Sequence, residues 1–216
     1  MSFIIARNLK KDYPMGKTTV HALRGVDLEV AKGENLSGGC PSGAGESTLG
    51  GYRASQASAG VDVRALSPKA LHRFRRQRIA FIFQSFNLVP VLNARENIEF
   101  PLLIQKVPAA ERQRRIDKLA DEVSIREYLN HKPDELSGGQ RQRVAIARAL
   151  VTAPEVVFAD EPTANLDSAN GQAVLELMRR LNREEKTTFI IASHDQAVMS
   201  EADRMIRVID GMICHD

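Results

Sequence analysis

Two adjacent carboxylates follow a run of apolar residues in the C-terminal half of the chain. The run, residues 156–159, leads directly into Asp160 and Glu161. Such a run predicts a strand buried on both faces of a parallel sheet, and α/β proteins bind ligands at the carboxyl ends of these strands. An Asp there can hold Mg²⁺, and the next Glu can orient or deprotonate a water. The alternative is a solvated strand end.

A pair of glycines marks a second site upstream. Leu136-Ser137-Gly138-Gly139-Gln140 opens an Arg- and Ala-rich stretch that predicts a helix. Ser137 and Gln140 have the spacing of a capping box, so an N-cap explains part of the motif. It does not explain two consecutive glycines, which let a backbone approach a ligand closely. Because helix N-termini favour anions, the motif predicts a contact with phosphate.

These motifs resemble those of ABC ATPases. Residues 136–140 match the signature motif, and Asp160 with Glu161 matches the Walker B motif. Further matches stand in the family's order: Tyr13 for the aromatic that stacks on adenine, Gln84 for the Q-loop, residues 165–167 for the D-loop and His194 for the switch histidine. Each alone has a structural explanation: a packing aromatic, a strand-end polar residue, a core or surface histidine. Their joint occurrence argues against chance.

The resemblance is closest to the lipoprotein-release and macrolide-export ATPases, through residues 83–90 and 96–102. It implies an α/β, P-loop NTPase fold of the ABC ATPase type. This fold has a mostly parallel sheet core, an N-terminal antiparallel β-subdomain and an inserted helical subdomain. We expect one ABC ATPase domain over residues 1–216, with a core of about 1–84 and 151–216 and a helical subdomain of about 85–150.

The pattern of apolar residues agrees with this fold. Short apolar runs alternate with turn signals in the first forty residues, as expected for strands of a small sheet. Runs at 79–83, 155–159 and 188–192 predict buried parallel strands, and 94–150 is mostly helical. Pro101, Pro108 and Pro133 are expected to punctuate that helical stretch.

The phosphate loop departs from the family pattern. The family reads G-x-x-x-x-G-K-[ST], whereas this chain, aligned on Ser47, has Cys40 at the first glycine and Glu46 at the lysine. A carboxylate there replaces an attraction for phosphate with a repulsion. Since one charge pair at about 4 Å is worth on the order of 4 kcal/mol at an effective dielectric near 20, ATP affinity should fall severely.

The residues around this loop are also off-pattern. Asn35–Gly39 is expected to be a poor buried strand, Gly50 and Gly51 fall in the first turns of the next helix, and residues 51–60 lack a clear strand. Three explanations remain for the interval 35–60. It is a decayed or misread stretch, it belongs to a degenerate ATPase kept as a scaffold or regulatory subunit, or it belongs to a working enzyme with an unusual loop.

The resemblance implies a nucleotide site shared by two subunits packed head to tail. Glu161 and His194 would act in hydrolysis, and Asp167 belongs to the D-loop. Mg²⁺ would be held by Ser47, Gln84 and Asp160. ATP would contact one subunit at Tyr13, Ser42, Gly43, Ala44, Gly45, Glu46, Ser47, Thr48 and Gln84. It would contact the other subunit at Leu136, Ser137, Gly138, Gly139 and Gln140.

The composition limits the partners. The net charge is +3 with a basic run at residues 72–78, which could suggest nucleic acid, but a solvated helix face is the commoner explanation. We expect no nucleic acid, because nucleic-acid-linked ABC proteins usually carry tandem cassettes, coiled coils or zinc modules. Cys40 and Cys214 are far apart and imply neither a disulfide framework nor a zinc site, which fits a reducing compartment.

A separate membrane protein is the expected partner. No segment approaches the length needed to span a bilayer. The resemblance implies an integral membrane permease that docks beside Gln84, with residues 86–90 as the contact or, alternatively, as an ordinary surface loop. We expect a homodimer or heterodimer of ATPase subunits in the cytoplasm, peripheral on the inner face of the cell membrane.

Replacing Glu46 with Lys should raise ATP affinity, because the change restores the cation that faces the phosphates. The reversal is worth several kcal/mol, which corresponds to at least about a hundredfold in the dissociation constant. Nucleotide binding and phosphate release on the purified chains measure it. Micromolar affinity and Mg²⁺-dependent turnover in the native chain would contradict the expectation. If Glu46→Lys stays inactive, the rest of the interval is the larger defect.

Overall fold

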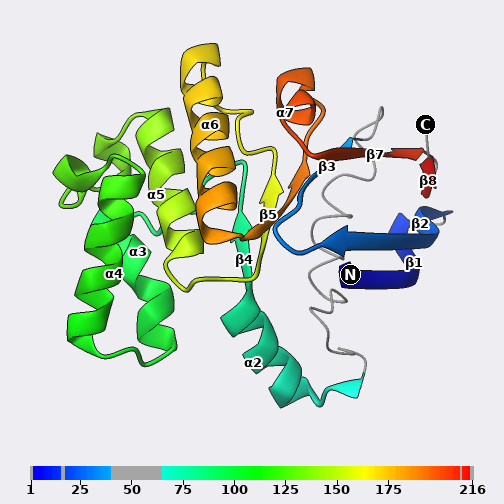
Figure 1. The fold of residues 1–216 in the computed structure, drawn as a ribbon, viewed down its shortest axis with the longest axis horizontal. Helices are drawn as coiled ribbons and strands as arrows, with labels where there is room; N and C mark the ends of the chain where they lie inside the picture. Colours follow the sequence, from blue (N-terminus) through cyan, green and yellow to red (C-terminus); the bar gives the residue numbers. More distant parts are fainter. Residues whose placement is uncertain (1, 16–17, 40–64, 210, 215–216) are drawn as a thin grey trace.

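A six-stranded sheet runs through the middle of the molecule (Figure 1). The structure, a computed structural model, describes residues 2–15, 18–39, 65–209 and 211–214. The strands stand in the order β4-β5-β6-β3-β7-β8. The first five are parallel, and β8 is antiparallel to β7. Their bounds are β3 Asn35–Gly39, β4 Ile79–Ile82, β5 Val156–Asp160, β6 Thr188–Ala192, β7 Arg204–Ile209 and β8 Met212–Cys214.

Both faces of the central strands are buried, as a parallel sheet requires. Alternate side chains of a strand point to opposite faces, so Phe158 and Ile190 pack in one apolar cluster while Phe189 and Ile191 pack in the other. All four are at most 4% exposed. The apolar runs of β5 and β6 are therefore explained by burial on two sides, as the sequence predicts.

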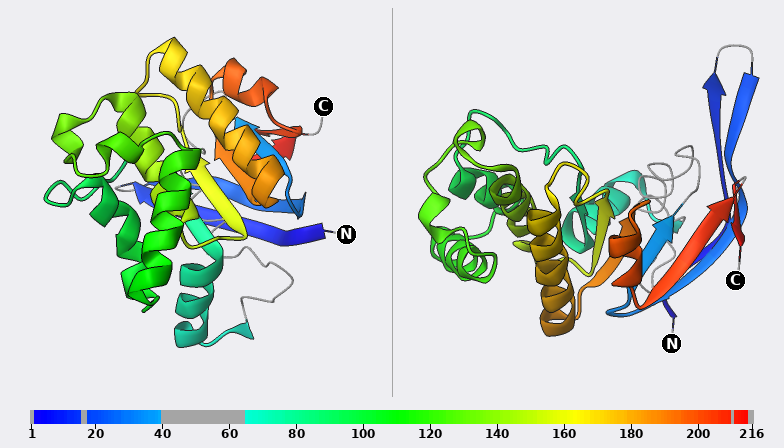
Figure 2. Two further views of the ribbon diagram at one scale, coloured as in Figure 1. Left: turned by 60° about the vertical axis from the view of Figure 1, so that its left-hand side comes forward. Right: turned by 90° about the horizontal axis from the view of Figure 1, so that it is seen from above.

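Helices cover one face of the sheet. Figure 2 shows them as the green and yellow layer beside the strands. They share one apolar cluster with that face. The helices of this layer are α3 Ala94–Ile104, α4 Ala109–Glu122, α5 Gly138–Leu150 and α6 Ser168–Glu185, with the short 3₁₀ helices η2 Arg126–Tyr128 and η3 Pro133–Glu135 between α4 and α5.

A long antiparallel hairpin covers the other face (Figure 2). It consists of β1 Ser2–Met15 and β2 Thr18–Ala31. Leu9 and Leu23 of the hairpin are 1% exposed and belong to the same apolar cluster as Phe158. In the part of the chain that the structure describes, the remaining helices are α2 Pro68–Arg78, which precedes β4, and α7 Gln196–Ser200, which precedes β7. The predicted α/β architecture is confirmed.

Two local expectations are wrong. Asn35–Gly39 forms a regular strand despite its composition, because parallel neighbours on both sides supply hydrogen bonds and Leu36 is fully buried. Pro101 lies inside α3 rather than ending a helix. Ile98 and Leu102, both fully buried, hold that helix in the core on either side of the proline, so packing overrides the local cost.

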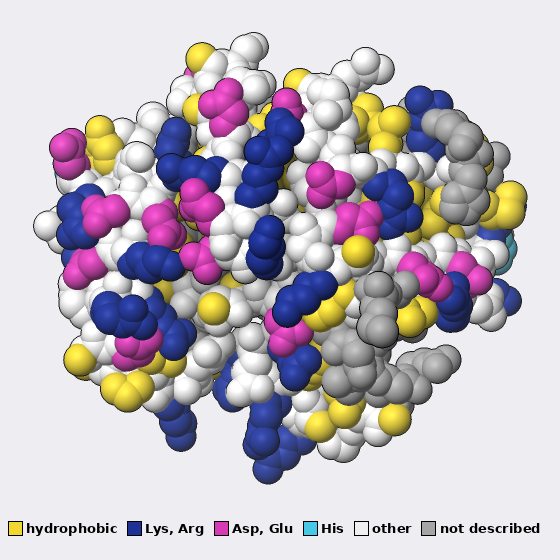
Figure 3. Space-filling model, viewed as in Figure 1, with side chains coloured by type: hydrophobic (Ala, Val, Ile, Leu, Met, Phe, Trp, Pro, Cys, Tyr) yellow, Lys and Arg dark blue, Asp and Glu magenta, His cyan; other side chains and the backbone are white. Residues whose placement is uncertain are grey.

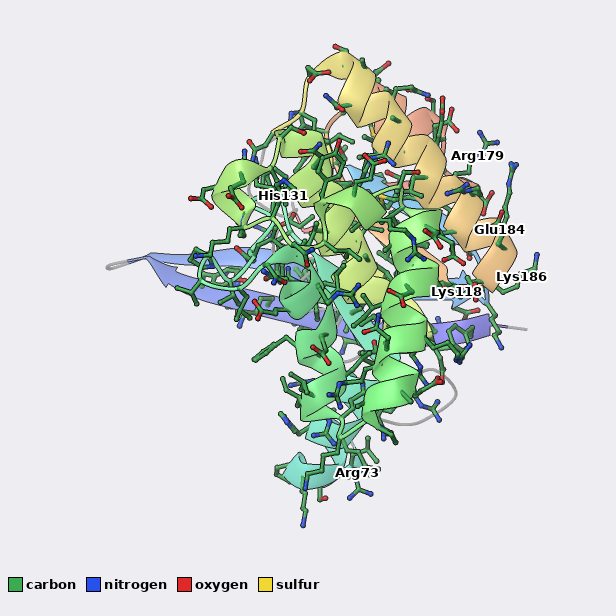
Figure 4. The ribbon with its side chains drawn as sticks, turned by 90° about the vertical axis from the view of Figure 1, so that its left-hand side faces the viewer. Arg73, Lys118, His131, Arg179, Glu184 and Lys186 are labelled. Atoms are coloured by element: carbon green, nitrogen blue, oxygen red, sulfur yellow. The ribbon has the colours of Figure 1, made fainter. Side chains whose placement is uncertain are left out.

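The basic run at residues 72–78 lies on α2 and faces solvent. Most of its side chains are exposed and Phe74 alone is buried, as expected for a solvated helix face. Arg73 projects at the end of the molecule formed by α2 (Figure 4). On the face shown in Figure 3, Lys and Arg side chains are interspersed with Asp and Glu. No helix in the described part of the chain has the length and apolarity to cross a membrane.

Candidate functional site

The predicted site residues follow parallel strands at one edge of the sheet. Asp160 ends β5 and Glu161 follows it, Ser193 and His194 follow β6, and Gln84 lies two positions beyond the end of β4. Backbone hydrogen bonds join these ends: Glu161 N donates to Ala192 O at 2.9 Å, and Ser193 N donates to Gly38 O at 3.2 Å. β3 leads at this edge into the predicted phosphate loop, residues 40–48, which lies outside the described residues.

Glu161 is the most constrained carboxylate of this edge. Its side chain accepts hydrogen bonds from Ser193 Oγ at 2.9 Å, from His194 N at 3.0 Å and from His194 Nδ1. The residue is 8% exposed, and its φ of 43° lies in the left-handed region, which costs on the order of 1–3 kcal/mol outside glycine. A carboxylate offers about four acceptor positions, so one position beyond these three donors can accept a water.

Asp160 precedes Glu161 and shares its surroundings. Burial, followed by the negative charge of Glu161, raises the pKa of Asp160. A divalent cation would relieve this repulsion. Mg²⁺ is usually held by one or two carboxylates together with water and phosphate oxygens. A single carboxylate at the end of a strand, such as Asp160, fits a magnesium ion of this kind.

His194 presents its ring to solvent. The side chain is 72% exposed although Nδ1 bonds to Glu161. The imidazole of a histidine can donate or accept at either ring nitrogen according to its tautomer, and a protonated ring donates from both. This geometry brings His194 and Glu161 together as one polar unit at the strand ends.

The Q-loop residue is joined to the D-loop. Asn165 Nδ2 donates to the backbone oxygen of Gln84 at 2.9 Å. Asp167 caps α6, because its side chain accepts from Asn170 N at 3.0 Å and from Asn170 Nδ2 at 2.6 Å. These bonds from Asn170, backbone first and side chain second, lower the pKa of Asp167. The D-loop therefore has a fixed shape beside β4.

The signature motif forms the start of α5 as the capping-box spacing predicts. Gln140 N donates to Ser137 Oγ at 3.3 Å, and Ser137 N donates to Gln140 Oε1 at 2.8 Å. Gln142, fully buried in the next turn, donates from Nε2 to Pro162 O at 2.7 Å. The signature helix is thus tied to the residue that follows Glu161.

The two signature glycines let this helix approach the D-loop within the chain. A Cβ on Gly139 would lie 2.6 Å from Asn170 Oδ1, and one on Gly138 would lie 3.3 Å from a methyl of Leu166. The Asn170 side chain cannot easily turn aside, because it is bonded to Asp167. Close packing against Asn170 is therefore one reason for a glycine at position 139. The predicted contact with ATP held by a second subunit is another.

Tyr13 lies apart from this edge, towards the turn end of the β1–β2 hairpin. It is 39% exposed, and Lys11 Nζ lies 5.0 Å from its ring centroid. Its role with adenine stays a prediction. The same holds for the predicted contacts of the phosphate loop, which lie outside the described residues: Ser42, Gly43, Ala44, Gly45, Glu46, Ser47 and Thr48.

Several side-chain contacts that complete the site were not predicted, although Asn165 lies in the predicted D-loop and Ser193 next to the predicted switch histidine. Ser193 is fully buried against Glu161, and Asn165, Asn170 and Gln142 join the motifs to one another. Ser193, Asn165 and Gln142 bond to residues that are 20 to 81 positions away in the sequence. The position of Ser193 directly after an apolar run was the one available signal.

A cavity of about 300 Å³ lies at the opposite edge of the sheet, between α4, the end of α5 and the end of α6. Figure 4 shows Lys118 on the same side as Glu184 and Lys186. Charged side chains that line the cavity pair with one another: Lys118 Nζ lies 2.8 Å from Glu185, and Arg115 lies 2.6 Å from Glu111. Since ligands of parallel sheets bind at the carboxyl edge, the cavity is not the nucleotide site.

Comparison with known proteins defines the class. A sequence model of the ABC transporter family matches residues 23–164. An ABC transporter ATP-binding protein of Thermotoga maritima is 41% identical over 211 residues, which are 94% of this chain and 90% of that protein. The chain therefore belongs to the ABC transporter family as an ABC-type ATPase.

Two further relatives place the chain within that family. The macrolide export ATP-binding/permease protein MacB of Rhodopirellula baltica is 39% identical over 222 residues, and the match covers 96% of this chain but 32% of that protein. The dimeric ATP-binding cassette MJ0796, bound to ADP and Pi, has a TM-score of 0.87 at 35% identity, covering 98% of this chain and 97% of that one. The chain is thus similar over nearly its whole length to the MJ0796 cassette and to about a third of MacB.

Replacing Gly139 with Ala should lower the free energy of unfolding by about 1–3 kcal/mol, because the added methyl group meets the fixed Asn170 side chain. For a chain of this size, that is a fall in Tm of about 2–4 °C per kcal/mol. Thermal unfolding followed by circular dichroism measures it.

Gly171→Ala is the matched control on α6. A Cβ there meets Thr163 at an ordinary 3.6 Å, so the better helix propensity of Ala should stabilise the chain by up to about 1 kcal/mol. If Gly139→Ala unfolds at the native temperature or above, the close packing is not a constraint.

Proposed function

We propose that this chain binds and hydrolyses ATP to drive a separate membrane permease of the export or lipoprotein-release type. Support comes from the macrolide export proteins, which combine an ATP-binding part and a permease, and of which this chain matches about a third. On this proposal, residues 1–216 are one ABC ATPase domain, with a helical subdomain over about 85–150. The chain acts in the cytoplasm, peripheral on the inner face of the cell membrane.

One observation carries the hydrolytic part of the proposal. Glu161 stands at the carboxyl end of β5 with its carboxylate fixed by Ser193 and His194, and one acceptor position is left for a water. A general base must lie within hydrogen-bond reach of the proton it takes, in a fixed orientation. The three donors supply that orientation.

Glu161 and His194 would act together at the γ-phosphate of ATP. Glu161 orients the attacking water and accepts its proton, while His194 contacts a γ-phosphate oxygen. The N–H groups of the phosphate loop, among them those of Gly43 and Gly45, cradle the phosphates. Tyr13 stacks on adenine. Stabilising charge in place, rather than covalent chemistry, lowers the barrier to phosphoryl transfer.

Magnesium would be held by Ser47, Gln84 and Asp160 together with phosphate oxygens and water. Burial, followed by the negative charge of Glu161, raises the pKa of Asp160, and a bound cation would offset both effects, which supports this assignment. When bound, Mg²⁺ neutralises charge on the β- and γ-phosphates.

The second half of the site would come from another ATPase subunit, in a homodimer or heterodimer. MJ0796, which the chain resembles over nearly its whole length, forms a dimer. The capped N-terminus of α5 leaves N–H groups directed outwards, a suitable contact for phosphate. Leu136, Ser137, Gly138, Gly139 and Gln140 would therefore bind the ATP held by the partner.

The permease would dock beside Gln84 and α3. Val91 is 75% exposed in the loop before α3, and Phe100, Leu103 and Ile104 are nearly half exposed on that helix. An exposed apolar patch of this kind marks a surface that binds another protein. A cytoplasmic helix of the permease is the partner that the proposal implies.

A scaffold or regulatory subunit is the second candidate. The observation that favours it is Glu46, which places a carboxylate where the family has the phosphate-binding lysine. Such a chain would keep the dimer and permease contacts without turnover.

Glu161→Gln should lower the rate of ATP hydrolysis by about a hundredfold or more, because the amide cannot accept the proton of the water. ATP affinity should stay within about threefold. Phosphate release and equilibrium nucleotide binding are measured in the native chain and in the Glu46→Lys variant. Glu155→Gln, at the opposite end of β5, is the control and should leave the rate unchanged.

An unchanged rate in Glu161→Gln would exclude the proposed role. If neither the native chain nor Glu46→Lys hydrolyses ATP, while both bind the permease, the scaffold candidate is correct.

A further inference from the structure

A strained turn follows the Q-loop glutamine. Phe86 and Asn87 have φ of 62° and 47°, so two consecutive residues other than glycine are left-handed. Phe86 N donates to Phe83 O at 3.1 Å, and Asn87 N donates to Ser85 O at 2.7 Å. Asn tolerates this conformation, but Phe does so at a cost, and such a turn persists only where its surroundings hold it.

Two arginines of helix α5 hold this turn in place. The guanidinium of Arg148 donates to Phe86 O at 2.7 Å and to Asn87 O. Two helical turns earlier, and therefore on the same face, Arg141 lies 5.4 Å from the centroid of the Phe86 ring. Arg148 thus holds the backbone of the turn, and Arg141 contacts its aromatic side chain.

Arg148 is well suited to this contact. Burial lowers its pKa, yet a guanidinium remains charged at neutral pH, so its hydrogen bonds to the two carbonyls are charge-assisted. The planar group can satisfy two neighbouring oxygens at once, which a lysine cannot do with the same geometry.

The loop beyond the turn is fixed as well. Asn97 of α3 is fully buried and accepts from Val89 N at 2.8 Å. Its Nδ2 donates to the backbone oxygens of Val89, Leu92 and Asn93 at 2.9–3.2 Å. Val91, at the exposed tip, is therefore presented on a backbone held at both ends, by Arg148 before it and by Asn97 after it.

The same helix reaches the catalytic edge. It begins at the signature motif with Ser137 as its cap, and Gln142 bonds to Pro162, next to Glu161. A helix moves as a rigid element, so a displacement at its N-terminus reaches the Phe86–Asn87 turn through Arg148.

We infer that Arg148 is a positioning residue that couples the signature helix to the surface that receives the permease. This inference rests on the proposed function. Arg148 neither contacts the nucleotide nor contributes to docking directly; it fixes the turn from which the docking loop extends.

Hydrogen exchange of the full chain tests the local contact without a partner. Arg148→Met and the charge-conserving Arg148→Lys should raise the exchange rate of amides 85–89 by about tenfold or more, with Met the larger effect. The control is Arg143→Met on the same helix, because Arg143 Nη1 bonds to Val123 O at 3.0 Å instead. That control should change amides near residue 123 and leave 85–89 unchanged. Equal exchange at 85–89 in all variants overturns the inference.

The coupling is tested in the complex purified with its permease. Arg148→Lys should keep the permease-free rate of ATP hydrolysis within about twofold but lose most of the stimulation by the permease. Arg143→Met should keep both. Loss of both rates in Arg148→Lys, or retention of full stimulation, overturns the coupling role. If no permease is recovered and no ATP is hydrolysed, the proposed function fails, and the exchange experiment still decides whether Arg148 holds the turn.

Discussion

The hydrogen bonds that Glu161 accepts from Ser193 and His194 join the ends of two parallel strands, and the other parts of the site are arranged around that junction. β5 and β6 are paired up to Asp160 and Ala192, so the polar residues emerge side by side from a buried sheet. Pro162, directly after Glu161, accepts the bond from the signature helix. A shift of either strand end would therefore displace the Glu161 carboxylate and the signature motif together.

Three of the eight described residues other than glycine that have a positive φ lie where the chain changes direction beside this junction. Glu161, Phe86 and Asn87 all have left-handed φ angles, and each is held by side chains from another element. Glycine would adopt these angles without cost, but it would supply neither a carboxylate nor an aromatic ring. The strain is offset by a buried serine in one place and by a half-buried arginine in the other.

Local pattern was sufficient for part of this arrangement. The sequence predicts β5, β6 and the Ser137–Gln140 capping box, because apolar runs and cap spacing are properties of neighbouring residues. Sequence pattern fails for β3, because pairing with a parallel strand on each side compensates for a composition that is unfavourable for a buried strand. It also misses Asn170 and Arg148, because their importance arises from contacts with Gly139 and with residues 86–87 that only the folded chain brings together.

Paramagnetic broadening by Mn·ATP shows whether Mg·ATP binds at the carboxyl edge of the sheet. Millimolar nucleotide reveals even weak binding, so the test does not depend on a tight phosphate loop. We expect the backbone amide signals of Gln84, Asp160, Glu161 and His194 to broaden, and those of Lys118 and Glu185, which line the cavity at the opposite edge, to remain sharp. Broadening confined to that cavity, or none at any of these positions, would contradict the account.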